Sequence, residues 1–132
     1  MSNPQKAQGT REETRVTRDH NSIDGITAWR LAEQGTNDPG DVAVHLESTG
    51  DHIILECKHR DRLNIHQTVQ KAKKKAETAD LPFIPTLTAV VWHRTIRVAG
   101  ERGVPAGTVV CLDYEDWLEL VSWLQELGEG VD

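Results

Sequence analysis

The spacing of apolar residues changes along the chain, and each change indicates a new element. A helix is predicted over 11–22, where Thr10 would cap its start and Glu13 would complete a capping box. The stretch 26–31 has the composition of a short strand. It is followed at 35–40 by GTNDPG, which is typical of a turn. The first third of the chain therefore indicates a helix and then a strand.

The clearest pattern is strict alternation over 41–58, which predicts a β-hairpin. One predicted face is apolar and carries Val42, Val44, Leu46, Ile53, Leu55 and Cys57. A two-residue turn at 49–50 would place Asp41 opposite Lys58 and put Glu56 on the same face. Because a slip of one residue would exchange the two faces, the apolar pattern supports this sorting. The polar face thus gathers charge at the open end of the hairpin.

The second half of the chain adds a helix at 63–79, a buried strand at 86–92 and a strand at 107–112. Residues 93–106, rich in Arg and Gly, indicate a long basic loop. A last helix is predicted over 115–126. Its inner side would carry Trp117, Leu120, Val121 and Leu124, and Trp117 and Trp123 are interpreted as core or dimer-contact residues. The order α-β-β-β-α-β-β-α predicts an α/β domain with a mixed central β-sheet flanked by helices.

Length and composition fit one soluble domain. The 132 residues suit a single domain over 10–127, with a flexible lead at 1–9 and a flexible tail at 128–132. No apolar run approaches the roughly 20 residues of a membrane span, and the first residues lack the apolar core of a secretion signal. Two isolated cysteines are read as reduced thiols. We therefore expect a cytoplasmic protein without a membrane partner.

Charge is unevenly distributed, and this affects the choice of partners. The net charge of −6 argues weakly against nucleic acid. However, the segment 58–75 is strongly basic, while the acidic residues concentrate near the C-terminus. The lysines of the 71–76 run either contact phosphate or form a solvated helix face. The basic loop at 93–106 is either a DNA-binding loop or an ordinary connection.

Three residues converge at the open end of the hairpin and suggest a reaction. Asp41 and Glu56 would supply two carboxylates to a hard divalent cation such as Mg²⁺, which keeps water ligands for a substrate phosphate. Lys58 beside them could orient an attacking water or stabilise charge on the phosphate. These are the parts that phosphodiester hydrolysis needs. The alternative is a surface ion pair between Lys58 and Asp41.

The residues also resemble a known family. Gly40-Asp41, followed by Glu56-Cys57-Lys58 on an apolar strand, resembles the PD-(D/E)XK nuclease motif, with Gly in place of the usual Pro. The ordered series of motifs from about Glu13 to Leu120 is more specific, and it resembles the Holliday junction resolvase-like endonucleases of actinobacterial phages. The other segments that carry it are Gly35–Asp41, Ile54–Lys58, Val90–Arg94 and Thr108–Val110.

The resemblance implies a PD-(D/E)XK restriction-endonuclease-like core and assigns roles to residues. Asp41, Glu56 and Glu13 would bind Mg²⁺, for which Mn²⁺ can substitute, and Lys58 would be the catalytic lysine. Gln67 matches a polar position of the family more weakly, and Glu12 remains an alternative to Glu13. The candidate DNA contacts are Arg60, Lys71, Lys74, His93, Arg94, Arg97 and Arg102.

The function expected from these residues is Mg²⁺-dependent cleavage of DNA, with branched junctions as the substrate that the resemblance implies. Two symmetric cuts would require a homodimer. For a phage-encoded protein, the compartment would be the cytoplasm of the host cell. A non-catalytic DNA-binding or assembly protein with the same fold, or a sequence-specific restriction-type nuclease, remains an alternative. A zinc site at His45 and His52 is disfavoured because no third ligand stands at a suitable spacing.

Overall fold

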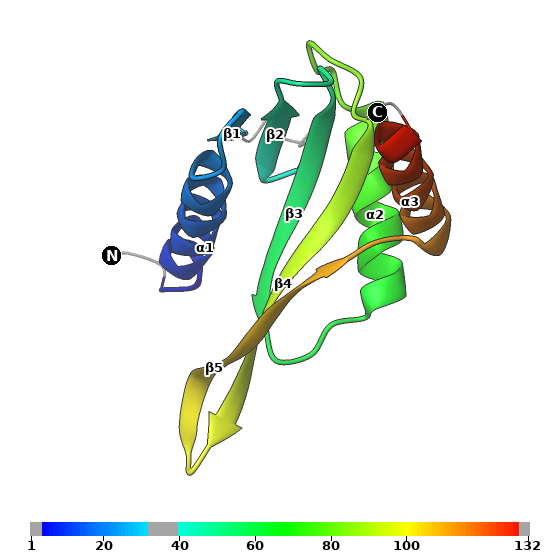
Figure 1. Ribbon diagram of the computed structural model, residues 1–132. Coiled ribbons are helices and arrows are strands. Elements are labelled where there is room, and N and C mark those ends of the chain that lie inside the picture. Colours follow the sequence, from blue (N-terminus) through cyan, green and yellow to red (C-terminus); the bar gives the residue numbers. More distant parts are fainter. Residues whose placement is uncertain (1–3, 32–39, 130–132) are drawn as a thin grey trace.

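The computed structural model describes residues 4–31 and 40–129, in which a five-stranded sheet lies between helices (Figure 1). In chain order the elements are α1 (Pro4–Asn21), β1 (Ile26–Arg30), β2 (Val42–Leu46), β3 (His52–Arg60), α2 (Ile65–Thr78), β4 (Leu87–Val98), β5 (Glu101–Cys111) and α3 (Tyr114–Glu129). The strands lie in the order β1-β2-β3-β4-β5. Only the β3–β4 pair is parallel. The predicted α/β architecture with a mixed sheet is confirmed.

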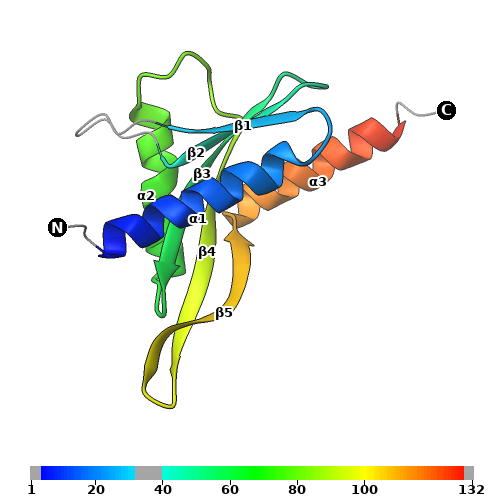
Figure 2. The same ribbon diagram turned by 90° about the vertical axis from the view of Figure 1, so that its left-hand side faces the viewer.

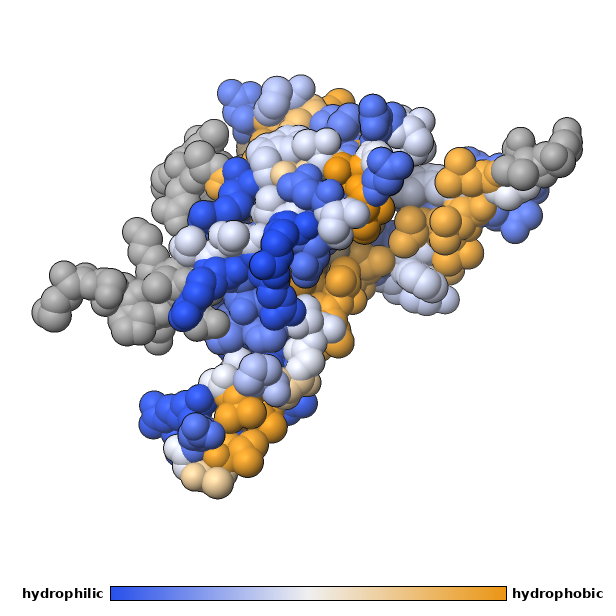
Figure 3. Space-filling view, turned by 60° about the vertical axis from the view of Figure 1, so that its left-hand side comes forward, coloured by the Kyte–Doolittle hydropathy of each residue, from blue (hydrophilic) through white to orange (hydrophobic). Residues whose placement is uncertain are grey.

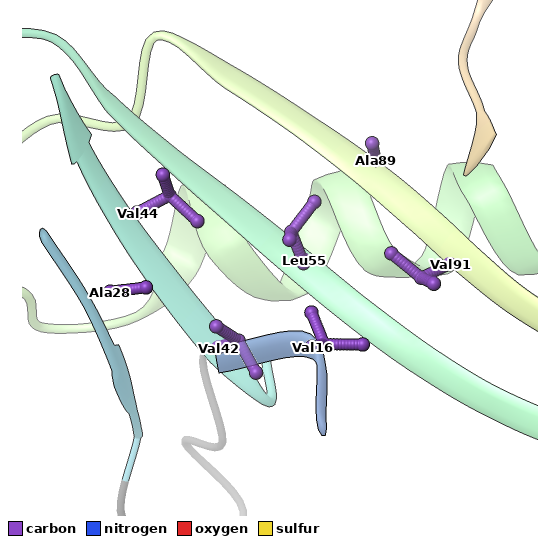
Figure 4. Close-up of a cluster of buried hydrophobic side chains, with 7 residues drawn as sticks. All are labelled: Val16, Ala28, Val42, Val44, Leu55, Ala89 and Val91. Atoms are coloured by element: carbon purple, nitrogen blue, oxygen red, sulfur yellow. The ribbon is translucent and has the colours of Figure 1, made fainter. Parts of the chain in front are cut away.

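Helix α1 covers one face of the sheet and crosses the strands obliquely (Figure 2). On this face the core is made of small and branched side chains, shown in Figure 4. Its buried members are Val16, Ala28, Val42, Val44, Leu55, Ala89 and Val91. Among the α1 residues whose side chains are described, 10–21, only Val16 belongs to this cluster, so this part of the helix brings little apolar surface to the sheet.

Helix α2 covers the opposite face. Asn64 caps its start by accepting a hydrogen bond from the Gln67 N–H, and Val69, Ala72 and Ala76 form its buried side. These small side chains let the helix lie close to Ile54 and Val90, which are fully buried. The helix predicted over 63–79 is therefore confirmed, although Ile65 at its start is exposed.

The register of the β2–β3 hairpin differs by two residues from the predicted one. Val42 pairs with Leu55 and His45 with His52, because the connection is a four-residue turn at 47–50 and not a two-residue turn. The Gly50 N–H closes this turn on the Leu46 carbonyl. A shift of two residues keeps every side chain on its predicted face. It also moves Asp41 from the level of Lys58 to that of Glu56.

The basic loop predicted over 93–106 is wrong. Strands β4 and β5 continue through this segment as a long hairpin that projects beyond the helices (Figures 1 and 2). Ala99 and Gly100, both at positive φ, make its two-residue turn. Pro105 is compatible with β5 because an edge strand can spare an N–H group on its open side. Gly and Pro here mark an irregular strand.

Both terminal helices are longer than predicted. Helix α1 begins at Pro4, so Thr10 lies inside it and does not cap it, and residues 4–9 are not a separate lead. Helix α3 extends to Glu129, into the expected tail. The turn predicted over 35–40 lies outside the described residues except for Gly40. No helix in the described ranges has the length and apolar character needed to cross a membrane.

The prediction that α3 packs its apolar side inward is wrong. None of its residues is buried, and Trp117, Val121 and Leu124 are exposed. Figure 3 shows the resulting hydrophobic surface on the arm of the molecule that projects away from the sheet. Lys73 of α2 ties the start of α3 to the body: its Nζ lies 2.8 Å from an Asp113 oxygen and 3.1 Å from an Asp116 oxygen. Charge, and not apolar burial, attaches this helix.

We predict that Lys73→Ala loosens α3 with a small effect on the rest of the fold. Hydrogen exchange of the amides in 114–129 should become faster, while the free energy of global unfolding changes by less than about 1 kcal/mol. Lys74→Ala, one residue along the same helix, is the control and should leave this exchange unchanged. Equal protection of α3 in the Lys73 variant and the unmodified protein would contradict the role of this ion pair.

Candidate active site

Gly40 allows the chain to approach β3 closely just before Asp41. Its φ is +135°, and a Cβ atom placed there would lie 2.6 Å from Ile54 Cγ2. The next residue is fixed by the backbone: the Asp41 N–H donates to the Leu55 carbonyl at 3.0 Å. The Asp41 carboxylate in turn accepts a hydrogen bond from the Cys57 N–H at 2.6 Å. Asp41 is thereby held against β3 at the level of Glu56.

The carboxyl groups of Asp41 and Glu56 repel each other in a poorly solvated setting. Burial, and then the charge of Glu56, raise the pKa of Asp41 from 3.8 to about 7, although the Cys57 N–H and Lys75 oppose the shift. Glu56 itself is 7% exposed. Two carboxylates held in this way favour any cation that can lie near both of them.

Two lysines compensate the charge of Glu56. Lys75 of α2 lies 3.2 Å from both carboxylate oxygens, and Lys58 Nζ lies 3.6 Å from one of them. The sequence left open an ion pair between Lys58 and Asp41. In the structure Lys58 pairs with Glu56 instead. Cys57 between them points to the α1 side, where burial and the surrounding carboxylates raise the pKa of its thiol. A nucleophilic thiolate is disfavoured at this position.

The two acids of α1 that the sequence could not separate point in different directions. Glu13 accepts from Arg30 at 2.8 Å, and it is close enough to contribute to the raised pKa of Asp41. Glu12 lies toward His59 and His93. Glu13 is therefore the α1 acid on the Asp41 side. However, its carboxylate does not join those of Asp41 and Glu56 in a compact set of three ligands within the described residues.

A cavity of about 570 Å³ opens beside Glu56 and Lys58, between β3 and the start of α2. We call it the basic pocket. One acid and five basic side chains line it, and the basic ones are Lys58, Arg60, Arg62, Lys71 and Lys75. Gln67 also lines it, beside the capped start of α2. A pocket with this charge suits an anionic ligand.

The seven predicted DNA contacts separate into groups. Arg60 and Lys71 line the basic pocket, and Arg94 pairs with Arg60 on the neighbouring strand. Arg97 and Arg102 are exposed on the projecting hairpin. The remaining two are His93 and Lys74. His93 is buried on the α1 face, and Lys74 lines a different cavity near the end of α2, so neither faces the pocket.

Sequence reasoning missed Lys75, which makes the closest contacts with Glu56. The run KAKKKA contains four lysines, of which Lys71 and Lys74 are the predicted DNA contacts. The spacing of four residues from Gln67 to Lys71 and again to Lys75 places these three on one side of a helix. This spacing could have grouped Lys75 with Gln67 and Lys71. The sequence could not show that this side of the helix faces β3.

Comparison with known proteins adds no relatives. No family model, curated protein or solved structure matches this chain.

We predict that Gly40→Ala destabilises the protein more than Gly50→Ala. Both positions have positive φ, but only at Gly40 does the added methyl group meet another side chain. The Gly40 variant should lose roughly 1–3 kcal/mol in chemical denaturation beyond the loss in the Gly50 variant, which has the strained φ alone. Equal losses would show that the contact with Ile54 relaxes without cost.

We predict that Asp41→Asn stabilises the metal-free protein above neutral pH. In the folded protein Asp41 retains its proton to about pH 7, while the unfolded chain releases it near pH 3.8. The folded state therefore loses stability as pH rises from about 4 through 7, to a limit of about 4 kcal/mol. Asn avoids this loss, so its gain in melting temperature over the native protein should be larger at pH 8 than at pH 5.

Asp51→Asn is the control for this measurement. The pKa of Asp51 is lowered by hydrogen bonds from Thr49 and Thr86, so its ionised form already favours folding. Its replacement should bring no gain as pH rises. A gain for Asp41→Asn that is the same at both pH values would contradict the buried, repelled carboxylate.

Proposed function

We propose that this protein is a Mg²⁺-dependent DNA endonuclease. The observation that carries the proposal is the placement of Asp41 and Glu56 at one level of paired strands, with Lys58 on the same strand as Glu56 and beside the basic pocket. Glu56 and Lys58 line the pocket that a phosphodiester group could enter, and Asp41 lies at the level of Glu56 on the neighbouring strand. This arrangement agrees with the roles that the resemblance to PD-(D/E)XK nucleases implies.

The residues fit a hard divalent cation. Asp41 and Glu56 would hold it, because both offer carboxylate oxygens and because burial and the charge of Glu56 raise the pKa of Asp41, which a bound cation would counteract. Glu13 would support the site from α1. When bound, Mg²⁺ or its substitute Mn²⁺ would polarise the phosphate and acidify a water ligand.

The other residues of the pocket have distinct roles in this proposal. Lys58 would orient the attacking water or stabilise the charge that develops on the phosphate. Lys75 balances Glu56 in the free protein, and Gln67 offers a neutral donor at the pocket wall. Arg60, Arg62 and Lys71 would bind phosphates on either side of the cut.

The proposed substrate is branched DNA, and the proposed active form is a homodimer. The basic surface continues from the pocket onto Arg94, which lies opposite Arg60 on the neighbouring strand, and the exposed arginines of the β4–β5 hairpin extend it. The exposed apolar side of α3 offers a surface for a second copy. A two-fold pair of active sites would cut a four-way junction symmetrically.

The test is cleavage of a synthetic four-way junction by the purified chain with Mg²⁺ and with a chelator. Cleavage should require Mg²⁺ and give two symmetric nicks. Glu56→Gln and Lys58→Met should each slow it by about 100-fold or more, because each removes a group needed at the reacting phosphate. Lys74→Met, a lysine outside the pocket, should cleave at the native rate.

Binding of the same DNA separates the alternatives. If both site variants bind the junction and fold normally but do not cleave it, the catalytic assignment stands. Cleavage that survives both changes would overturn the site. A native protein that binds the junction without cutting it would indicate the non-catalytic alternative.

A further inference from the structure

A second group of potential metal ligands lies on the α1 face of the sheet, away from the basic pocket. It consists of Glu12 from α1, His59 from β3 and His93 from β4. The two histidines are neighbours because they pair in register on adjacent strands. One ligand atom from each lies within 4.8 Å of the other two, and no other set of three in the described ranges does so. We propose that these residues bind a single Zn²⁺ ion.

The distances are close to those of a coordinated ion. The Nδ1 atoms of His59 and His93 lie 3.9 and 3.8 Å from the two oxygens of Glu12. In a tetrahedral zinc site with bonds of about 2.0–2.1 Å, neighbouring ligand atoms are roughly 3.3 Å apart. The rings of His59 and His93 are stacked with their centroids 5.0 Å apart, so one ring must turn and the Glu12 carboxylate must move inward before the three ligand atoms meet at one ion.

His59 has a nitrogen that the protein does not use. Its Nδ1 atom is shielded from solvent and has no hydrogen-bond partner among the described residues. A buried polar atom without a partner is costly, and at His59 a carboxylate and a second imidazole lie close enough to share an ion with it. Burial lowers the pKa of His59 against the opposing effect of Glu12, and the neutral ring is the form that binds metal.

The Nδ1 atom of His93 is in contact with a hydroxyl group. Thr108 Oγ1 lies 2.7 Å from this nitrogen and accepts a hydrogen bond from Arg15 at 3.2 Å. In the tautomer that carries its proton on Nε2, His93 Nδ1 accepts the Thr108 hydroxyl hydrogen. A metal ion would use the same lone pair, and the exposed Thr108 hydroxyl would turn to water.

Two imidazoles and one carboxylate favour Zn²⁺ over Mg²⁺, which prefers oxygen ligands alone. Arg15 now lies 3.8 Å from Glu12, and its side chain is 42% exposed, so it can withdraw when the ion enters. The site joins α1 to two central strands at the point where the helix has little apolar surface. Zinc would therefore strengthen the attachment of α1.

The test is calorimetric titration of the full chain with Zn²⁺ in excess Mg²⁺, which occupies oxygen-only sites. We expect one equivalent of Zn²⁺ to bind and to raise the melting temperature. Glu12→Gln and His59→Gln should each weaken binding by at least about tenfold and abolish the thermal shift. Failure of the native chain to bind Zn²⁺ would overturn the proposal.

His45→Gln is the matched control. His45 has the same orphaned Nδ1 and lies against another histidine, His52, but within the described part of the chain no carboxylate completes a set of three there. This variant should bind Zn²⁺ as the native chain does, and an equal loss of binding would overturn the assignment. Co²⁺ provides a second measurement: it should give visible absorption bands typical of nitrogen ligands, which Zn²⁺ removes and which Glu12→Gln lacks.

Discussion

A carboxylate buried in the centre of a sheet must be balanced by positive charge, and the arrangement of this protein depends on how Glu56 is balanced. Lys75 contacts both oxygens of Glu56, so α2 must turn this lysine toward β3. The small buried residues of α2 pack on the same face of the sheet. The packing of the helix and the charge of the pocket are therefore set together. Burial of Asp41, and then the charge of Glu56 across the strand pair, raise the pKa of Asp41.

The elements with strong local patterns could be predicted from the sequence. Alternation over 41–58 indicated both strands of the first hairpin and the face of every residue in it, including Asp41, Glu56 and Lys58. The exact register could not be read, because two-residue and four-residue turns at 47–50 give the same parity and the same sorting of faces. The four-residue turn is what places Asp41 at the level of Glu56 instead of Lys58.

Where local composition and tertiary pairing disagree, the sequence was misleading. Gly103, Pro105 and Gly107 indicate a loop when taken alone, but pairing with β4 holds them in an edge strand. In α3 the apolar residues follow helical spacing correctly, yet this spacing only shows that a face exists and not that the same chain covers it. Lys75 was missed for a related reason, since its partner is distant in sequence.

Strand β3 places two different chemical environments on its two sides. Glu56 and Lys58 point to α2, while Cys57 and His59 point to α1, simply because successive residues of a strand face opposite ways. Carboxylate and basic groups gather on one side, and imidazoles with a single carboxylate on the other. A strand of ordinary length can thus serve two sites that never share a side chain.

The irregular course of β5 has a consequence for how this protein behaves at high concentration. A long edge strand in a projecting hairpin such as β4–β5 would normally allow strands of other molecules to add to the sheet. Here Pro105 has no N–H group to donate, and Gly103 and Gly107, both at positive φ, interrupt the extended backbone on either side of it. The β4–β5 hairpin can therefore remain uncovered while resisting self-association through its backbone.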